Sequence, residues 1–313
     1  MSEFATTPPI PYVPIGDQAS AVRSAINVYS KLETYSQAEV DSFFFNRAPD
    51  ADVTAYITAV ETALGTTIEA ALPYAINPKH KIYNFVTAEK AASRWALHKR
   101  IYLPIYNNAA ASAIDMVSRT NGTFQGVGVT HAAGYVQGDG TSGSFLLNAN
   151  LPTMGVGHTN ISAGGLCYIA PSSNNSTLFS AFDSVSQVVD VFHSSSVTLV
   201  SRVGVLAVGG EATITTTNFA GHRGVILSSY NGSSRFLKIR RSSGIITGTG
   251  SSTAVGATPT ATPRFMADSR NSNWSNAGYG AFYISSAMTS SDADGFITAI
   301  ETLWESLTGL TLP

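Results

Sequence analysis

The spacing of apolar residues predicts that positions 17–100 are largely helical, because apolar side chains recur every three or four residues, as on one face of a helix. Asp17, Ser36 and Asp50 each stand where an N-cap is expected, and Ser36 forms a capping box with Glu39. The expected helices occupy residues 18–32, 36–48, 50–65 and 87–100.

After Pro104 the pattern changes to short runs in which apolar and polar residues alternate, separated by clusters of Ser, Gly and Asn. Alternation predicts β-strands, and turns at intervals of roughly 8–12 residues are typical of an antiparallel sandwich or barrel. We therefore expect a mainly β domain over 105–313, closed by a helix over about 290–307. The expected strands include residues 124–129, 187–192, 197–200, 212–215, 224–227, 236–239 and 278–284.

The first sixteen residues are rich in proline, which excludes a regular helix there. Large apolar side chains stand between the prolines, so we expect an extended arm that docks on a larger body, with a flexible terminus as the alternative. The expected division is a docking arm at 1–16, a helical attachment and oligomerisation region at 17–104 and a β-sandwich domain at 105–313. The residues expected to make the attachment contacts are Ile10, Tyr12, Val13, Tyr35, Val40, Phe43 and Phe44.

Composition narrows the classes of partner. Only 12% of the residues are charged, and the net charge of −2 provides no basic surface for nucleic acid. Low charge is also typical of a subunit whose surface is covered by neighbours. The first residues lack the basic and apolar regions of a secretory signal, and no apolar run approaches the ~20 residues of a membrane span. We expect a protein made in the cytoplasm that does not insert into a membrane.

No constellation of residues predicts catalysis, a cofactor or a metal centre. The six histidines are scattered, and the single Cys167 lies in an apolar run that predicts a buried core thiol. Asp139 has oxygen ligands suited to Ca²⁺, but the dense acidic loop of calcium sites is missing, so a tight turn is expected. A glycosidase needs two carboxylates, and no two acids of the β region share a strand; pairs from different strands, such as Glu211 and Asp268, stay open.

One basic cluster and one aromatic residue are candidates for ligand contact. Lys238 and Arg240 would share one face of a strand, while Leu237 and Ile239 would point to the other. The simpler interpretation is that this basic face is solvated. The more specific one is that it contacts an acidic neighbour or an anionic glycan. Trp274 could stack on a sugar or cap the core.

Two passages resemble phage proteins. Residues 32–41, Leu-Glu-Thr-Tyr-Ser-Gln-Ala-Glu-Val-Asp, are similar to the Tyr-Ser/Thr-Lys-x-Glu-Val-Asp segment of tail-fibre and appendage proteins, which often lies where chains trimerise; Gln37 replaces the usual Lys. Residues 101–106 and 130–140 resemble a phage structural family with an Ile-Tyr-Pro-Phe entry and a Thr-His…Gly segment. Its domain is concanavalin A-like and its last strand precedes an acidic-capped helix. The resemblance covers about 100–313 but departs at Leu103-Pro104, and it implies no catalytic residues.

The motifs imply a non-enzymatic bacteriophage virion protein, namely a tail-fibre, appendage or capsid-decoration subunit that displays a concanavalin A-like jelly-roll β-sandwich. Its expected partners are capsid, neck or tail proteins, further copies of itself in a homotrimer, and a host-surface glycan. The alternative is a lectin-like adhesion protein that binds a receptor or carbohydrate. A depolymerase is a third hypothesis, and it requires a carboxylate pair.

Overall fold

The computed structural model describes residues 50–184, 187–204, 211–232, 234–250, 257–268 and 273–312. The chain divides after Pro49 into two compact units, and all the described residues belong to the second, Asp50–Pro313. The expected arm, the two helices before Pro49 and the attachment residues from Ile10 to Phe44 therefore lie outside the described residues.

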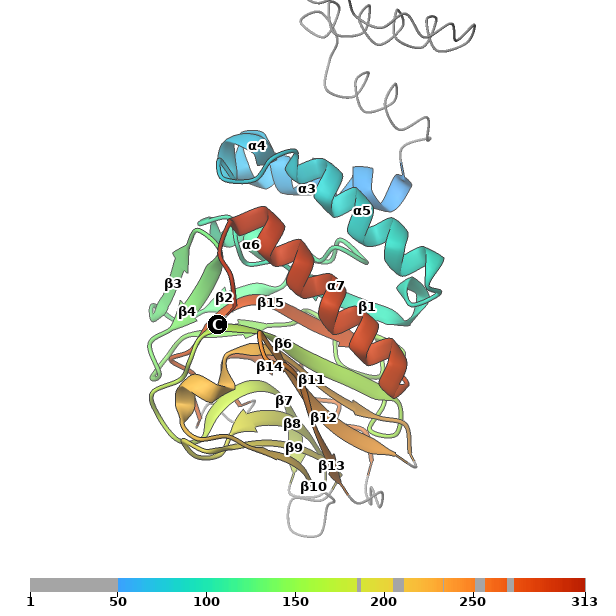
Figure 1. Cartoon of the computed structure of the whole chain (residues 1–313), viewed down its shortest axis with the longest axis vertical. Helices are drawn as coiled ribbons and strands as arrows, with labels where there is room; N and C mark the ends of the chain where they lie inside the picture. Colours follow the sequence, from blue (N-terminus) through green and yellow to red (C-terminus); the bar gives the residue numbers. More distant parts are fainter. Residues whose placement is uncertain are drawn as a thin grey trace, which may run out of the picture. The chain divides into compact units, whose positions relative to one another are not determined.

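Antiparallel strands form one continuous hydrogen-bonded order that folds over into two layers (Figure 1). The layers meet at one edge, where β10 and β13 pair at Ala212 and Gly250. The first layer, the front sheet, runs β2 (Thr123–Gln125), β5 (Ser144–Leu146), β14 (Arg264–Phe265), β7 (Ser176–Ser184), β8 (Gln187–His193), β9 (Thr198–Gly204) and β10 (Glu211–Thr215). The second layer, the back sheet, runs β13 (Gly244–Gly250), β12 (Arg235–Arg241), β11 (Gly224–Tyr230), β6 (Ile161–Ile169), β15 (Gly278–Ser285), β4 (Tyr135–Gly138) and β3 (Val129–Ala132), and β1 (His98–Tyr102) also pairs with β15.

Alternation along each strand builds the core between the two sheets. On β8 the side chains of Val189 and Val191 are buried in this core, and on β9 those of Leu199 and Val203 join them. The intervening residues point to the outer face of the front sheet, because successive side chains of a strand lie on opposite faces. The antiparallel β-sandwich expected from the sequence is confirmed.

Helices cover the outer face of the back sheet and form a second core with it (Figure 1). The indole of Trp304 anchors the last helix: its Nε1 donates to the Gly134 carbonyl at 2.7 Å, and a Cβ on Gly280 of β15 would stand 2.1 Å from the same nitrogen. Only glycine leaves room there for the ring. The described helices are α3 (Ala51–Leu64), α4 (Ile68–Ala71), α5 (Pro78–Ala91), α6 (Ala109–Ser112) and α7 (Ser290–Thr308), with short 3-10 turns η1 (Trp95–Leu97) and η2 (Phe219–His222).

Helix ends show which expectations hold. The Asp50 side chain accepts from the backbone of Asp52 and Val53, and Gly65 ends α3 in the left-handed conformation with φ of 67°, so the third expected helix is confirmed. The helix expected over 87–100 is wrong in its bounds. Pro78 begins α5 nine residues earlier than was expected, in the first turn where its missing N–H costs nothing, and the helix ends at Ala91.

The expected domain boundary after Pro104 falls inside the compact unit. Strand β1 pairs with β15 through Ile101 opposite Tyr283 and Tyr102 opposite Phe282, and α5 packs on α7. The residues from Asp50 onward therefore share one fold with the sandwich. Among the residues described, none of the helices has the length and apolar character that crossing a membrane requires.

Candidate functional site

Polar side chains form a row across the outer face of the front sheet. The antiparallel register places Asp190 of β8 opposite Arg202 of β9, and Arg202 opposite Glu211 of β10. Their chain neighbours Val191 and Val203 are buried between the sheets, so the three charged side chains point outward. A carboxylate, a guanidinium and a second carboxylate thus lie side by side on adjacent strands.

A cleft of about 320 Å³ lies over this row. That volume is at the small end of ligand cavities, which span about 300–1,000 Å³. The floor comes from the front sheet, and one wall comes from the connection between β14 and β15. The residues that line the cleft are Asn175, Thr177, Asp190, Phe192, Ser194, Val200, Arg202, Glu211, Asp268 and Asn273.

The guanidinium of Arg202 is fixed on two sides. Its Nε and Nη2 donate to the two oxygens of Asp190 at 3.1 and 2.8 Å, and its Cζ lies 4.2 Å from the centroid of the Phe192 ring. A bidentate pair of this kind is directional, and stacking on an aromatic face adds a second restraint. A guanidinium has five N–H donors, so others remain beyond the two that Asp190 accepts.

The wall of the cleft is held by reciprocal hydrogen bonds. The amide of Asn273 donates to Asp268 Oδ2 at 3.0 Å, and the Asp268 backbone N–H donates to the Asn273 carbonyl at 3.1 Å. Asp268 is almost fully buried, so this contact sets the position of the wall over the sheet. Hydrogen bonds within the chain therefore hold both faces of the cleft.

The lining combines carboxylate acceptors, amide and guanidinium donors and a small apolar surface at Phe192 and Val200. Such a set suits a small molecule with many hydroxyl groups, each of which can donate and accept. Within the described part of the chain, no group of three or more His, Cys, Asp or Glu side chains is placed to hold a metal ion.

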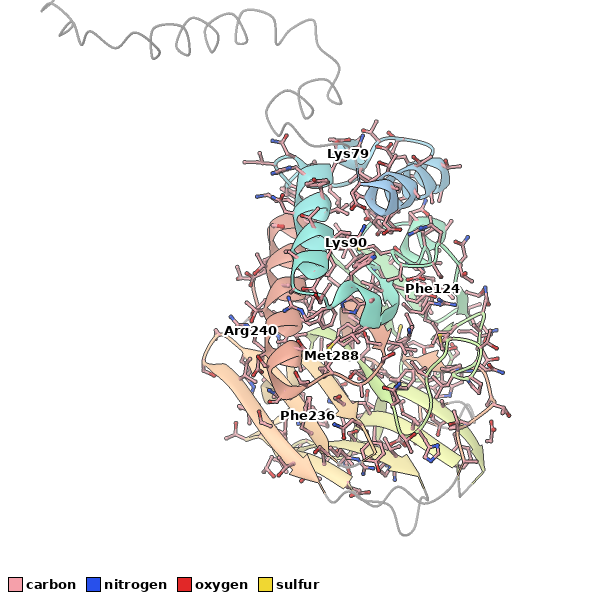
Figure 2. The ribbon with its side chains drawn as sticks, turned by 90° about the vertical axis from the view of Figure 1, so that its right-hand side faces the viewer. Lys79, Lys90, Phe124, Phe236, Arg240 and Met288 are labelled. Carbon is pink, nitrogen blue, oxygen red and sulfur yellow. The ribbon has the colours of Figure 1, made fainter. Side chains whose placement is uncertain are left out.

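The basic residues expected to contact a ligand have another role. Lys238 is 2% exposed, and its ammonium donates to the Ser290 carbonyl at 3.0 Å and to the Asp294 carboxylate at 2.6 Å. Arg240, which Figure 2 shows beside α7, donates to Glu301 of that helix. The acidic neighbour of both side chains is therefore α7 of the same chain.

The other singled-out residues also find places. Trp274 is half-buried, bridges to Ala267 and follows the cleft residue Asn273, but it does not line the cleft. Cys167 is fully buried as predicted, and burial raises the pKa of its thiol to about 12. The Asp139 carboxylate accepts hydrogen bonds that organise a tight turn, from the backbone N–H groups of Thr141, Ser142 and Gly143 and from the hydroxyls of Thr141 and Ser142.

A buried polar chain has the order of groups found in serine hydrolases. Ser285 Oγ lies 2.9 Å from His98 Nδ1, and His98 Nε2 lies 3.0 Å from Glu89. Ser285 is fully buried, Arg94 takes the other oxygen of Glu89 at 2.6 Å, and the Phe296 ring packs on His98 with centroids 4.6 Å apart. These groups tie α5 to β1 and β15, and no substrate can reach the serine. Sequence spacing gave no sign of the network, because its members come from distant segments.

Comparison with known proteins yields neither a matching family model nor a matching curated protein. Solved structures do resemble the chain. The binding domain of botulinum neurotoxin serotype C1 has a TM-score of 0.49 and 11% identity, over 66% of this chain and 52% of that one. Domain 4 of AbnA, a GH43 extracellular arabinanase from Geobacillus stearothermophilus in complex with arabinotriose, has a TM-score of 0.40 and 12% identity, over 64% and 98%. The Ca²⁺-bound exoplasmic/lumenal domain of VIP36 has a TM-score of 0.33 and 9% identity, over 61% and 91%.

These resemblances, at 9–12% identity, concern the β-sandwich architecture alone. The chain spans about half the length of the neurotoxin binding domains that it matches. The phage origin implied by the sequence motifs finds no support among these structures and stays a prediction.

Proposed function

We propose that this chain is a carbohydrate-binding β-sandwich protein and that the cleft on the front sheet holds the saccharide. The observation that carries the proposal is the fixed guanidinium of Arg202, held by Asp190 and Phe192 with Glu211 opposite on the next strand. A polar site that is ordered before its ligand arrives loses little conformational freedom on binding.

The chemistry of a sugar matches this arrangement. Two neighbouring hydroxyls can accept from the free N–H groups of Arg202 and donate to Glu211. The side-chain amides of Asn175 and Asn273 can hydrogen-bond further hydroxyls at the rim of the cleft. The apolar face of the ring can lie against Val200 at the floor. The small volume favours a terminal residue or a short segment of a glycan over a protein surface.

A glycan array probed with the full chain tests the proposal. The Arg202→Lys variant keeps the charge but loses the planar donor fork, so we expect its affinity for any glycan bound by the unaltered chain to fall about tenfold or more. Arg119→Lys is the matched control, because it makes the same change in another arginine that pairs with an aspartate, at 3.1 Å from Asp52 and away from the cleft.

Two outcomes would contradict the proposal. One is that the unaltered chain binds no glycan on the array. The other is equal binding by the Arg202→Lys and Arg119→Lys variants, which would place the ligand elsewhere on the molecule.

The virion role is the second candidate, and the Tyr-Ser-x-x-Glu-Val-Asp segment at 35–41 supports it. In that role the chain would be a phage appendage, fibre or capsid-decoration subunit, made in the host cytoplasm, attached by residues 1–48 as a homotrimer and presenting the cleft to a host-surface glycan. Deletion of residues 1–48 should abolish incorporation into particles. Normal assembly of the shortened chain would disprove the attachment role.

We further propose that the cleft binds without cleaving. Glu211 and Asp268 both line it, so the hypothesis that must be tested against binding is a carboxylate pair that hydrolyses the glycan. Incubation of a bound glycan with the chain should release no sugar. Sugar release that is lost in the Glu211→Gln and Asp268→Asn variants would establish a depolymerase instead.

A further inference from the structure

Two buried histidines meet at one end of the space between the sheets. His193 ends β8, and His222 lies in η2; both are fully buried. Their Nδ1 atoms are 2.9 Å apart and their rings stack with centroids 4.9 Å apart. Neither Nε2 has a hydrogen-bond partner among the described residues.

Arg241, the last residue of β12, lies beside this pair. A Cβ on Gly221 would stand 3.4 Å from Arg241 Nη2, which places the guanidinium against the residue that precedes His222. The Nε and Nη2 atoms of Arg241 are buried without a partner, and none of the carboxylates described forms an ion pair with this residue. Arg202 uses the equivalent two atoms to bind Asp190, so the unfilled pair on Arg241 is a carboxylate-type fork.

The unpaired atoms of this cluster are mostly donors. The Nδ1–Nδ1 hydrogen bond requires one neutral imidazole to donate and the other to accept, so the accepting ring carries its proton on Nε2. One imidazole N–H and the N–H groups of two guanidinium nitrogens are then left without an acceptor, against a single bare imidazole nitrogen. Even partial burial of an uncompensated guanidinium is costly, and it lowers the pKa of Arg241.

We propose that Arg241, His193 and His222 form a second binding site, which takes a small oxyanion such as a carboxylate or sulfate group. An oxyanion supplies several acceptors and the missing negative charge at once, whereas a water molecule supplies no charge and a cation would meet the guanidinium. The side chain of Arg241 is only partly buried, so the site opens to solvent on that side. This site is separate from the cleft of the front sheet.

Thermal unfolding of the full chain tests this site. At pH 7 and constant ionic strength, sodium chloride is replaced stepwise by sodium acetate or by sodium sulfate. The site predicts a saturable rise in Tm of roughly 2–4 °C with at least one of the two anions. Sulfate also stabilises proteins in general, but that effect grows without saturation.

Two variants separate the site from general effects. Arg241→Lys keeps the charge and loses the fork, so the saturable rise should disappear. Arg202→Lys changes an arginine whose fork is already occupied, and it should keep the rise. A response to acetate alone identifies a carboxylate ligand, and a response to sulfate alone identifies a tetrahedral one.

A second measurement does not depend on any variant. The imidazole ¹⁵N resonances of His193 and His222 in the unaltered chain should move saturably with the same anion and stay unchanged in chloride. Equal unfolding in all three salts with unmoved resonances would overturn the proposal, and so would an Arg241→Lys variant that responds like the unaltered chain.

Discussion

The stacked histidines predict an acid-sensitive fold. Burial lowers the pKa of His222 from 6.5 to about 4, with the charge of Arg241 as a smaller cause, and burial together with His222 holds the pKa of His193 well below its usual range. The unfolded chain therefore binds protons below about pH 6.5 that the folded chain does not. Folding stability is complete above that pH and falls as the solution is acidified towards pH 4.

The size of the effect follows from the two pKa values of His222. With 6.5 in the unfolded chain and about 4 in the folded chain, His222 alone removes about 2 kcal/mol of the free energy of unfolding between pH 8 and pH 5. The pKa of His193 is shifted in the same direction, so protonation of His193 adds to this loss. The aspartates with lowered pKa lose their contribution below about pH 4, outside this window.

Urea unfolding of the full chain, followed by circular dichroism between pH 4.5 and 8 in chloride buffers, measures this slope. The double variant His193→Gln/His222→Gln should start from lower stability but lose far less of it on acidification. His80→Gln, a change in a partly exposed histidine of α5, serves as the control. A double variant with the same pH slope as the unaltered chain would refute the argument.

Three further substitutions probe the packing of α7 and α5, each by chemical unfolding at pH 7.5. Gly280→Ala places a methyl group against the Trp304 indole and should cost about 3 kcal/mol, and an unchanged stability would show that the helix can shift. Glu89→Gln removes the buried carboxylate that pairs with the partly buried Arg94 and should cost about 3 kcal/mol, whereas a loss below 1 kcal/mol would mean that water reaches the network. Lys238→Met keeps the buried stem without the charge and should stay within about 1 kcal/mol of the unaltered chain, while Lys238→Ala should lose clearly more.

Most of the long strands could be predicted from the sequence, including β11 and β15, which are buried along their whole length, whereas β6 could not. Strand β8 alternates Val189, Asp190, Val191 and Phe192, so its existence follows from the pattern. Strand β6 is buried over Ile161–Cys167 between β11 and β15, and it contains no polar positions that face solvent to mark an alternation. Its small residues permit the close approach of neighbouring backbone instead.

The cleft lay beyond sequence reasoning for a geometrical reason. Asp190, Arg202 and Glu211 are separated along the chain, and only the register of three strands makes them neighbours. Glu211 and Asp268 stood out as acids, but nothing in their spacing indicated a common site. The assignment of Lys238 failed for the converse reason: the strand pattern was correct, and the covering helix lies more than fifty residues further along the chain.

The layer of helices has a consequence for synthesis of the protein. The core that contains α3 and α5 is completed by α7, which follows them far along the chain and leaves the ribosome after them. Until then, apolar side chains such as Phe85 lack their packing against Phe296 and its neighbours, which have not been made. Contacts between such distant segments form slowly. The nascent chain thus passes through a prolonged, aggregation-prone stage, and chaperone capacity in the cell should limit its yield.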